Sequence, residues 1–216
     1  AHQLECSPED LEYVNGVFQV KGDREKAQPL GAVAFEAFTA HNLPDGVEPT
    51  LSAEATIDPQ DFSFPHGTHL AAMEVDTETG KVTVRKYVCV DDVGVQVNPM
   101  IVEGQVHGGV AQGIAQALYE GANYDEDGQP QNANLSTYLI PSAPDLPSFI
   151  TDTTCTPSTT NPLGTKGVGE AGAIASTPAI INGIVDAIRH LGVNDVLMPA
   201  TPMTVWKTIQ AAQGGK

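Results

Sequence analysis

The first part of the chain places short apolar runs on either side of turn residues, a pattern typical of β-hairpins. Residues 11–14 and 17–20 are two such runs, and Asn15-Gly16 separates them. Because Asn and Gly tolerate the positive φ angles of a two-residue hairpin turn, this spacing predicts a hairpin. The polar residues 21–29 predict a loop after it.

The next segment predicts further β-structure. Residues 69–75 and 81–90 flank a polar turn at 76–80, which indicates a second hairpin. Additional strands are expected where apolar residues alternate with polar ones or form short bounded runs, at 51–57, 134–140 and 149–154.

Three segments have the period of α-helices. Residues 98–120 open with Asn-Pro, a cap and a first turn, and then carry apolar residues at helical spacing. A second helix is expected to end near residue 190. A third occupies about 201–212, with Val205, Trp206 and Ile209 as its predicted buried face. Hairpins and about three main helices without strict alternation predict an α+β fold with a mixed or antiparallel sheet.

Composition restricts the classes of function. The 216 residues include 10 basic and 27 acidic side chains, so the net charge is −17. Such a surface repels phosphate backbones and anionic lipids, and we therefore expect no nucleic-acid partner and no membrane-surface role. No apolar run approaches the roughly 18 residues of a membrane helix, so we expect no membrane insertion and a cytoplasmic location.

The cysteines exclude several metal sites and frameworks. Cys6, Cys89 and Cys155 lie far apart and form no CxxC pair. They cannot complete a disulfide framework, a four-cysteine zinc site or an iron–sulfur cluster on their own. His66 and His69 lie three residues apart, but without further ligands at fixed spacing they predict no metal site. Asp91-Asp92 is expected to be a solvated pair at a strand end.

The helix over 98–120 is unusually rich in glycine. Gly104, Gly108, Gly109 and Gly113 all lie in its interior, and each costs roughly 1 kcal/mol relative to alanine. Two explanations stay open. Either the helix packs closely on another element, or its backbone must come near a bulky cofactor. Gln105 lies among these small residues and would need a partner for its amide.

The loop 164–170, with sequence GTKGVGE, carries the second chemical signal. Its three glycines allow main-chain N–H groups to approach a ligand, and Lys166 adds a cation. Glu170 stands where the loop meets a helix. It is either a favourable partner of the helix dipole or a general base at the mouth of a glycine loop. The loop is no Walker A motif, because it lacks a Gly-Lys pair followed by Ser or Thr and its glycines have the wrong spacing.

Three stretches together resemble a known family. EGQVHGGVAQGIAQALYE (103–120), NPLGTKGVGEAGAIASTPAIINGIVDAI (161–188) and MPATPMTVW (198–206) are similar to the C-terminal part of the molybdopterin-binding large subunits of the xanthine dehydrogenase/aldehyde oxidase family. The stretch 65–105 fits the same pattern. Within this family, the chain resembles most the large subunits of the aerobic carbon monoxide dehydrogenase type.

The resemblance implies a cofactor and a set of site residues. The cofactor is molybdopterin, expected as its cytosine dinucleotide, whose dithiolene rather than protein side chains holds the molybdenum. The glutamate of the family's GVGE motif matches Glu170, which implies a general base in a hydroxylation that takes its oxygen from water. Gln105 and the main chain of Lys166, Gly167, Val168 and Gly169 match cofactor-facing segments.

The resemblance also implies partners, because it covers only about the last quarter of such subunits. We expect residues 1–30 to be the remnant of a preceding segment with a hairpin, and 31–216 to be the C-terminal molybdopterin-binding domain. The remainder of the large subunit, subunits carrying FAD and [2Fe-2S] clusters, and a small-molecule substrate complete the expected system. The chain alone should be inactive. The alternative is a structural or assembly domain that binds no cofactor.

Overall fold

The computed structural model describes residues 1–58 and 60–214, which form two compact units. The first unit is Ala1–Asp58 and the second is Pro59–Lys216. The chain therefore divides into its two compact units after residue 58. The reason is that a helix which the sequence analysis did not predict, α1 (Leu30–Thr39), contacts the last strand of the N-terminal sheet and buries Ala37.

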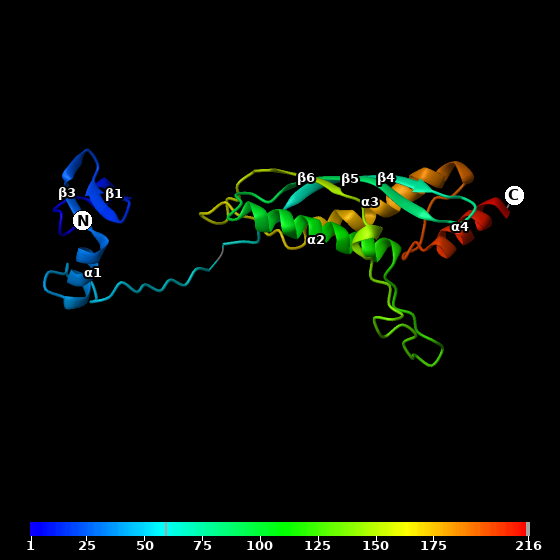
Figure 1. Cartoon of the computed structure of the whole chain (residues 1–216), viewed down its shortest axis with the longest axis horizontal. Coiled ribbons are helices and arrows are strands. Elements are labelled where there is room, and N and C mark those ends of the chain that lie inside the picture. The colour runs from blue at the N-terminus through cyan, green and yellow to red at the C-terminus, as the bar shows by residue number, and fades with distance from the viewer. Residues whose placement is uncertain (59, 215–216) are drawn as a thin grey trace. The chain divides into compact units, whose positions relative to one another are not determined.

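The first unit contains an antiparallel sheet in the order β1-β2-β3 and the helix α1 (Figure 1). Strands β1 (Leu11–Val14) and β2 (Val17–Val20) form the predicted hairpin, with Asn15 and Gly16 at φ angles of 50° and 85°. The loop predicted for 21–29 is wrong, because β3 (Asp23–Pro29) pairs with β2. A mostly exposed edge strand can be polar, because its partner strand satisfies the backbone while its side chains stay in water.

The second unit contains a three-stranded sheet, β4-β5-β6, with helices on one face (Figure 1). Strands β4 (His66–Val75) and β5 (Val82–Asp92) form the second predicted hairpin, and β6 (Phe149–Thr154) adds in parallel to β5. The sheet is therefore mixed, as predicted.

Two long helices pack together against this sheet. Helix α2 (Pro99–Leu118) begins at Asn98, whose side chain accepts a hydrogen bond from the amide of Ile101. Helix α3 (Ala171–Ile188) contacts both α2 and β4. It also has the length and hydropathy of a membrane-crossing helix. In this unit 33% of that span is buried, and the core includes Tyr87, Val110, Ile114, Ile180, Ile184 and Ile188.

The last helix, α4 (Pro202–Gly214), packs on the turn of the second hairpin. A Cβ at Gly80 would lie 2.7 Å from the amide nitrogen of Trp206, so only glycine allows this approach. Val205 and Ile209 are buried as predicted, whereas Trp206 is 38% exposed and does not belong to the buried face. The four α-helices and two sheets of the described residues make an α+β fold.

Two predicted strands are absent from the described residues. Residues 51–58 have no regular structure and no strand pairs with them in the part of the chain that the structure describes. Residues 134–140 form turns instead, because Asn134 accepts hydrogen bonds from the amides of Ser136 and Thr137. Such local bonds compete with strand pairing.

Candidate functional site

The four glycines of α2 fall into two pairs with different surroundings. Gly109 and Gly113 face α3, where a Cβ at Gly109 would lie 2.9 Å from the Cα of Gly172. Close packing therefore accounts for this pair. Gly104 and Gly108 are exposed, and within the described residues a Cβ at either would meet no other group within 4 Å. Packing within this chain gives no reason for the second pair.

The loop after β6 is fastened to the end of β5 by main-chain hydrogen bonds. The amide of Lys166 donates to the carbonyl oxygen of Val93, and the amide of Val95 donates to that of Gly164, both at 3.0 Å. Asn161 closes the loop internally, because its side chain donates to the carbonyl oxygen of Thr165 at 2.9 Å and accepts from the Thr165 amide at 3.1 Å. The loop therefore has a fixed conformation up to Lys166.

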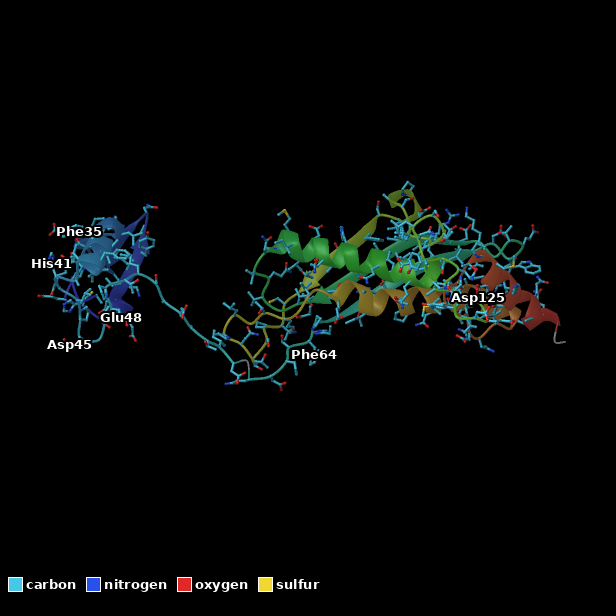
Figure 2. All side chains as sticks on the ribbon, turned by 90° about the horizontal axis from the view of Figure 1, so that it is seen from below. Phe35, His41, Asp45, Glu48, Phe64 and Asp125 are labelled. Atoms are coloured by element: carbon cyan, nitrogen blue, oxygen red, sulfur yellow. The ribbon has the colours of Figure 1, made fainter. Side chains whose placement is uncertain are left out.

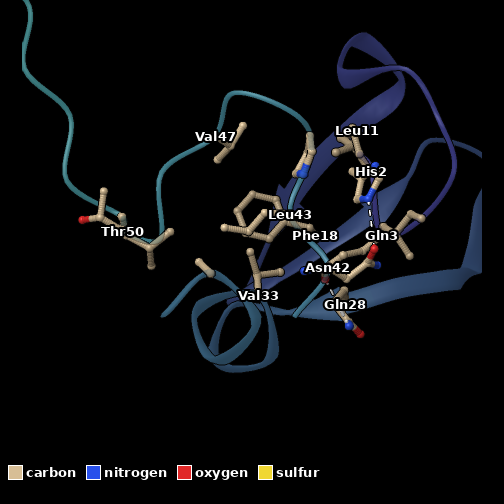
Figure 3. A pocket seen from close by; sticks show the side chains of 15 residues that line it. His2, Gln3, Leu11, Phe18, Gln28, Val33, Asn42, Leu43, Val47 and Thr50 are labelled. Atoms are coloured by element: carbon tan, nitrogen blue, oxygen red, sulfur yellow. Dashed lines mark hydrogen bonds between the residues drawn. The ribbon is translucent and has the colours of Figure 1, made fainter. Parts of the chain in front are cut away.

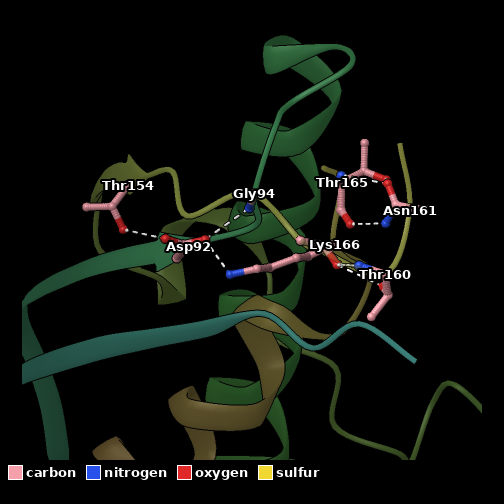
Figure 4. Close-up of polar contacts among 8 residues, drawn as sticks. Asp92, Gly94, Thr154, Thr160, Asn161, Thr165 and Lys166 are labelled. Carbon is pink, nitrogen blue, oxygen red and sulfur yellow. Dashed lines mark hydrogen bonds and ion pairs between the residues drawn. The ribbon is translucent and has the colours of Figure 1, made fainter. Parts of the chain in front are cut away.

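A buried ion pair fastens the same loop through side chains (Figure 4). The ammonium of Lys166 lies 2.8 Å from Oδ1 of Asp92, and the two side chains are 10% and 1% exposed. The expectation of a solvated aspartate pair is thus wrong, since Asp91 and Asp92 are both buried. The hydrogen bond from Lys166, with a smaller contribution from the amide of Gly94, holds the pKa of Asp92 well below its usual range against the opposing effect of burial.

Glu170 lies at the junction of this loop with α3. Its carbonyl oxygen accepts from the amides of Ala173 and Ile174, both at 3.0 Å, while its side chain is exposed and makes no capping hydrogen bond. Before it, Val168 packs on the buried residues Val93, Val102 and Ala171. The main chain at Glu170 is therefore anchored on both sides, and its carboxylate is free to meet another molecule.

The structure brings the two predicted cofactor-facing segments together. The amide nitrogen of the Gln105 side chain lies 3.7 Å from the position of a Cβ at Gly169. We call the exposed residues of these segments the open face, namely Gly104, Gln105 and Gly108 of α2 with Gly167, Gly169 and Glu170 of the loop. Lys166 does not belong to it, because its main-chain amide donates to Val93 and its ammonium is bound to Asp92.

A second cluster lies inside the unit, and sequence reasoning missed it. Nδ1 of His69 lies 2.8 Å from the hydroxyl of Tyr87, and Nε2 lies 3.2 Å from Oδ1 of Asp91, with Cys89 close by. Strand alternation could have found it, because Tyr87, Cys89 and Asp91 share one face of β5 and His69 pairs with Cys89. Both ring nitrogens of His69 are thus engaged with protein groups.

The same cluster is a poor thiolate site for a metal. Burial, with a smaller contribution from the charge of Asp91, raises the pKa of the Cys89 thiol to about 11. A thiol that stays protonated at neutral pH is a weak ligand. The geometry favours a hydrogen-bond network, in which Oδ2 of Asp91 has no protein partner among the described residues.

The first unit has an apolar pocket of about 260 Å³ (Figure 3). Its polar side chains bond to one another, since His2 lies 3.3 Å from Asn42 and Gln28 donates to Gln3 at 3.3 Å. The rest of the lining is mainly apolar and suits an apolar group. Its side chains include Leu4, Leu11, Phe18, Val33, Leu43 and Val47.

Comparisons with known proteins identify the family. The sequence profile of the molybdopterin cofactor-binding domain matches residues 1–147. The carbon monoxide dehydrogenase large chain of Hydrogenophaga pseudoflava is 39% identical over 210 residues, which are 97% of this chain and 26% of that protein. The chain therefore belongs to the molybdenum-binding large subunits of the xanthine dehydrogenase family, and it spans about a quarter of the length of such relatives.

Solved structures agree with this family. Quinoline 2-oxidoreductase from Pseudomonas putida 86 superposes with a TM-score of 0.90 at 38% identity, over 97% of this chain and 27% of that one. Carbon monoxide dehydrogenase from Oligotropha carboxidovorans also gives 0.90, at 34% identity, over 100% of this chain and 26% of that one. The second match covers the whole chain and therefore includes the loop with Glu170, which the profile match does not reach.

Proposed function

We propose that this chain forms the C-terminal part of a molybdenum hydroxylase large subunit, with Glu170 as the general base. The oxidation would be of the carbon monoxide dehydrogenase type or of an aldehyde or heterocycle, with oxygen taken from water. The observation that carries the proposal is the position of Glu170, an exposed carboxylate on an anchored loop beside Gln105.

The residues of the open face suit a molybdopterin, proposed as its cytosine dinucleotide. Gly104 and Gly108 leave space that no side chain of the described residues fills, so a flat ring system can approach the helix backbone. The Gln105 amide can donate and accept hydrogen bonds, and Gly167, Val168 and Gly169 offer main-chain donors. When bound, the cofactor would supply the oxidising molybdenum centre.

The role proposed for Glu170 is proton transfer. A carboxylate at the edge of the site can accept a proton from the water-derived oxygen nucleophile as it attacks the substrate carbon. The neighbouring Gly167 and Gly169 carry no side chain that would separate the carboxylate from its target. The anchored main chain holds the base in place, which lowers the entropy cost of reaching the reactive geometry.

The proposal includes partners that complete the site. These are the remainder of the large subunit and subunits with FAD and [2Fe-2S] clusters, which would carry the electrons away in the cytoplasm. Large apolar side chains are exposed on the surface, and Phe35 and Phe64 are two examples, at 66% and 75% exposed (Figure 2). Their exposure supports the proposal that other segments cover this surface. The chain alone would be inactive. We propose no nucleic-acid partner and no membrane insertion.

Cofactor analysis of the assembled protein tests this proposal. The chain is co-expressed with the remaining segments and partner subunits, and molybdenum and pterin are quantified after purification. We expect both in near-equal amounts, and a clear decrease of both in Gln105→Leu. The control Gln210→Leu makes the same change at an exposed position of α4 and should retain them. Absence of molybdenum and pterin in every pairing would favour the alternative, a structural or assembly domain.

A further inference from the structure

The ion pair between Asp92 and Lys166 differs from an ordinary surface pair. Its side chains are 1% and 10% exposed, whereas those of the Glu74–Arg85 pair are 57% and 61% exposed. Exposed pairs contribute little because water competes for both charges, while removal of one partner from a buried pair leaves an uncompensated charge. The buried pair therefore constrains the chain where the exposed one does not.

Asp92 gathers three segments around one carboxylate (Figure 4). Oδ1 accepts from the ammonium of Lys166 at 2.8 Å and from the amide of Gly94 at 3.0 Å, and Oδ2 accepts from the hydroxyl of Thr154 at 3.3 Å. The end of β5, the end of β6 and the glycine loop thus meet at this side chain. Loss of either charge would weaken the attachment of the loop to the sheet.

The residues after Lys166 lead directly to Glu170. Only Gly167, Val168 and Gly169 intervene, and the two glycines are conformationally permissive. Beyond Glu170 the chain is fixed again, because Ala171 and Gly172 are buried at the contact with α2. Within the segment, Val168 packs on buried residues, and the attachment at Lys166 fixes the N-terminal end.

We propose that Asp92 and Lys166 are positioning residues that fix the 164–170 loop and thereby hold Gly169 against Gln105 and Glu170 at the start of α3. Lys166 acts through Asp92 and is not a direct ligand of an anionic cofactor group. The fixing of the loop follows from the chain alone. Its consequence for turnover rests on the function proposed for Glu170.

Amide hydrogen exchange on the 216-residue chain tests the fixing of the loop without any cofactor. The cross-loop amides of Val95, Ser158 and Lys166 are the reporters, because each donates to a carbonyl oxygen at 3.0 Å. In Lys166→Met we expect them to exchange at least about tenfold faster, while core amides of β5 are unchanged. Lys166→Arg should restore protection, and the exposed control Arg85→Gln should have no effect.

Two outcomes would overturn this part of the proposal. One is unchanged exchange of the three reporters in Lys166→Met. The other is equal acceleration throughout the second unit, which would mean that the pair affects only global stability. If Lys166→Met fails to fold, the double variant Asp92→Asn with Lys166→Met removes both charges together, and we expect it to fold with the loop still deprotected.

The assembled enzyme separates the positioning role from direct ligation. We expect Lys166→Met to lower kcat with little change in KM, to retain molybdenum and pterin, and to recover activity in Lys166→Arg. Loss of the cofactor in Lys166→Met with normal loop exchange would instead make Lys166 a direct ligand and refute the proposal. Because hydrogen exchange needs no turnover, an inactive wild-type assembly would count against the proposed function and leave the loop result standing.

Discussion

The two sides of α2 use glycine for different reasons. On the side facing α3, the methyl group of an alanine would collide with main-chain atoms of α3 at Gly109 and with the Ser176 side chain at Gly113. On the other side, Gly104 and Gly108 face open space in the described residues. Both pairs cost the same helix propensity, and contacts among the described residues offset that cost for the first pair and not for the second.

This difference separates a close helix–helix contact from an open surface. Alanine at Gly104 or Gly108 would make the helix more stable, and no contact among the described residues explains these glycines. Both glycines belong to the open face, together with Gln105 and Glu170, where we propose that the cofactor binds. The contrast can be tested with single methyl groups at two adjacent positions.

The larger effect is expected for Gly109→Ala. The added methyl group would lie 2.9 Å from the Cα of Gly172 and from the amide nitrogen of Ala173, and neither backbone atom can move without separating α2 from α3. We expect the free energy of unfolding to fall by about 1–3 kcal/mol. Urea denaturation of the chain measures this. An unchanged midpoint would mean that the two helices do not pack as closely as described.

The smaller effect, of opposite sign, is expected for Gly108→Ala. The methyl group meets no other group of the described residues within 4 Å, and the helix gains propensity. We expect the isolated chain to be stabilised by up to about 1 kcal/mol. The same denaturation experiment measures it. A loss of stability comparable with that of Gly109→Ala would remove the distinction between the two sides of the helix.

Much of the fold could be predicted because local signals and tertiary packing agree. Asn15-Gly16 dictates its hairpin turn, and Asn98-Pro99 dictates the start of α2. The predictions are wrong where strand pairing, or a hydrogen bond from the main chain to a nearby side chain, determines the local structure. The polar strand Asp23–Pro29 forms because it pairs with β2. At 134–140, Asn134 accepts hydrogen bonds from amides that a strand would have paired with a neighbouring strand. The spacing of apolar residues indicates neither which strands pair nor which side chains accept hydrogen bonds from nearby amides.

The site was predictable in part. The glycine pattern indicated the helix and the loop, and the structure places Gln105 beside Gly169. The glycine pattern could not indicate that Lys166 is bound to Asp92, because 74 residues separate the two and only the fold brings them together. The buried network of His69, Tyr87 and Asp91 could have been inferred from strand alternation once β4 was paired with β5.

The central claim is that Glu170 serves as a base and not as a helix cap, and Glu170→Gln in the assembled enzyme tests it most directly. The substitution preserves size and removes the proton acceptor. We predict that turnover falls by about 10²–10⁴-fold, while molybdenum content, pterin content and the thermal midpoint stay at the wild-type values. The control Glu126→Gln, in an exposed turn, should remain fully active. Wild-type turnover in Glu170→Gln, or loss of the fold, would contradict the account.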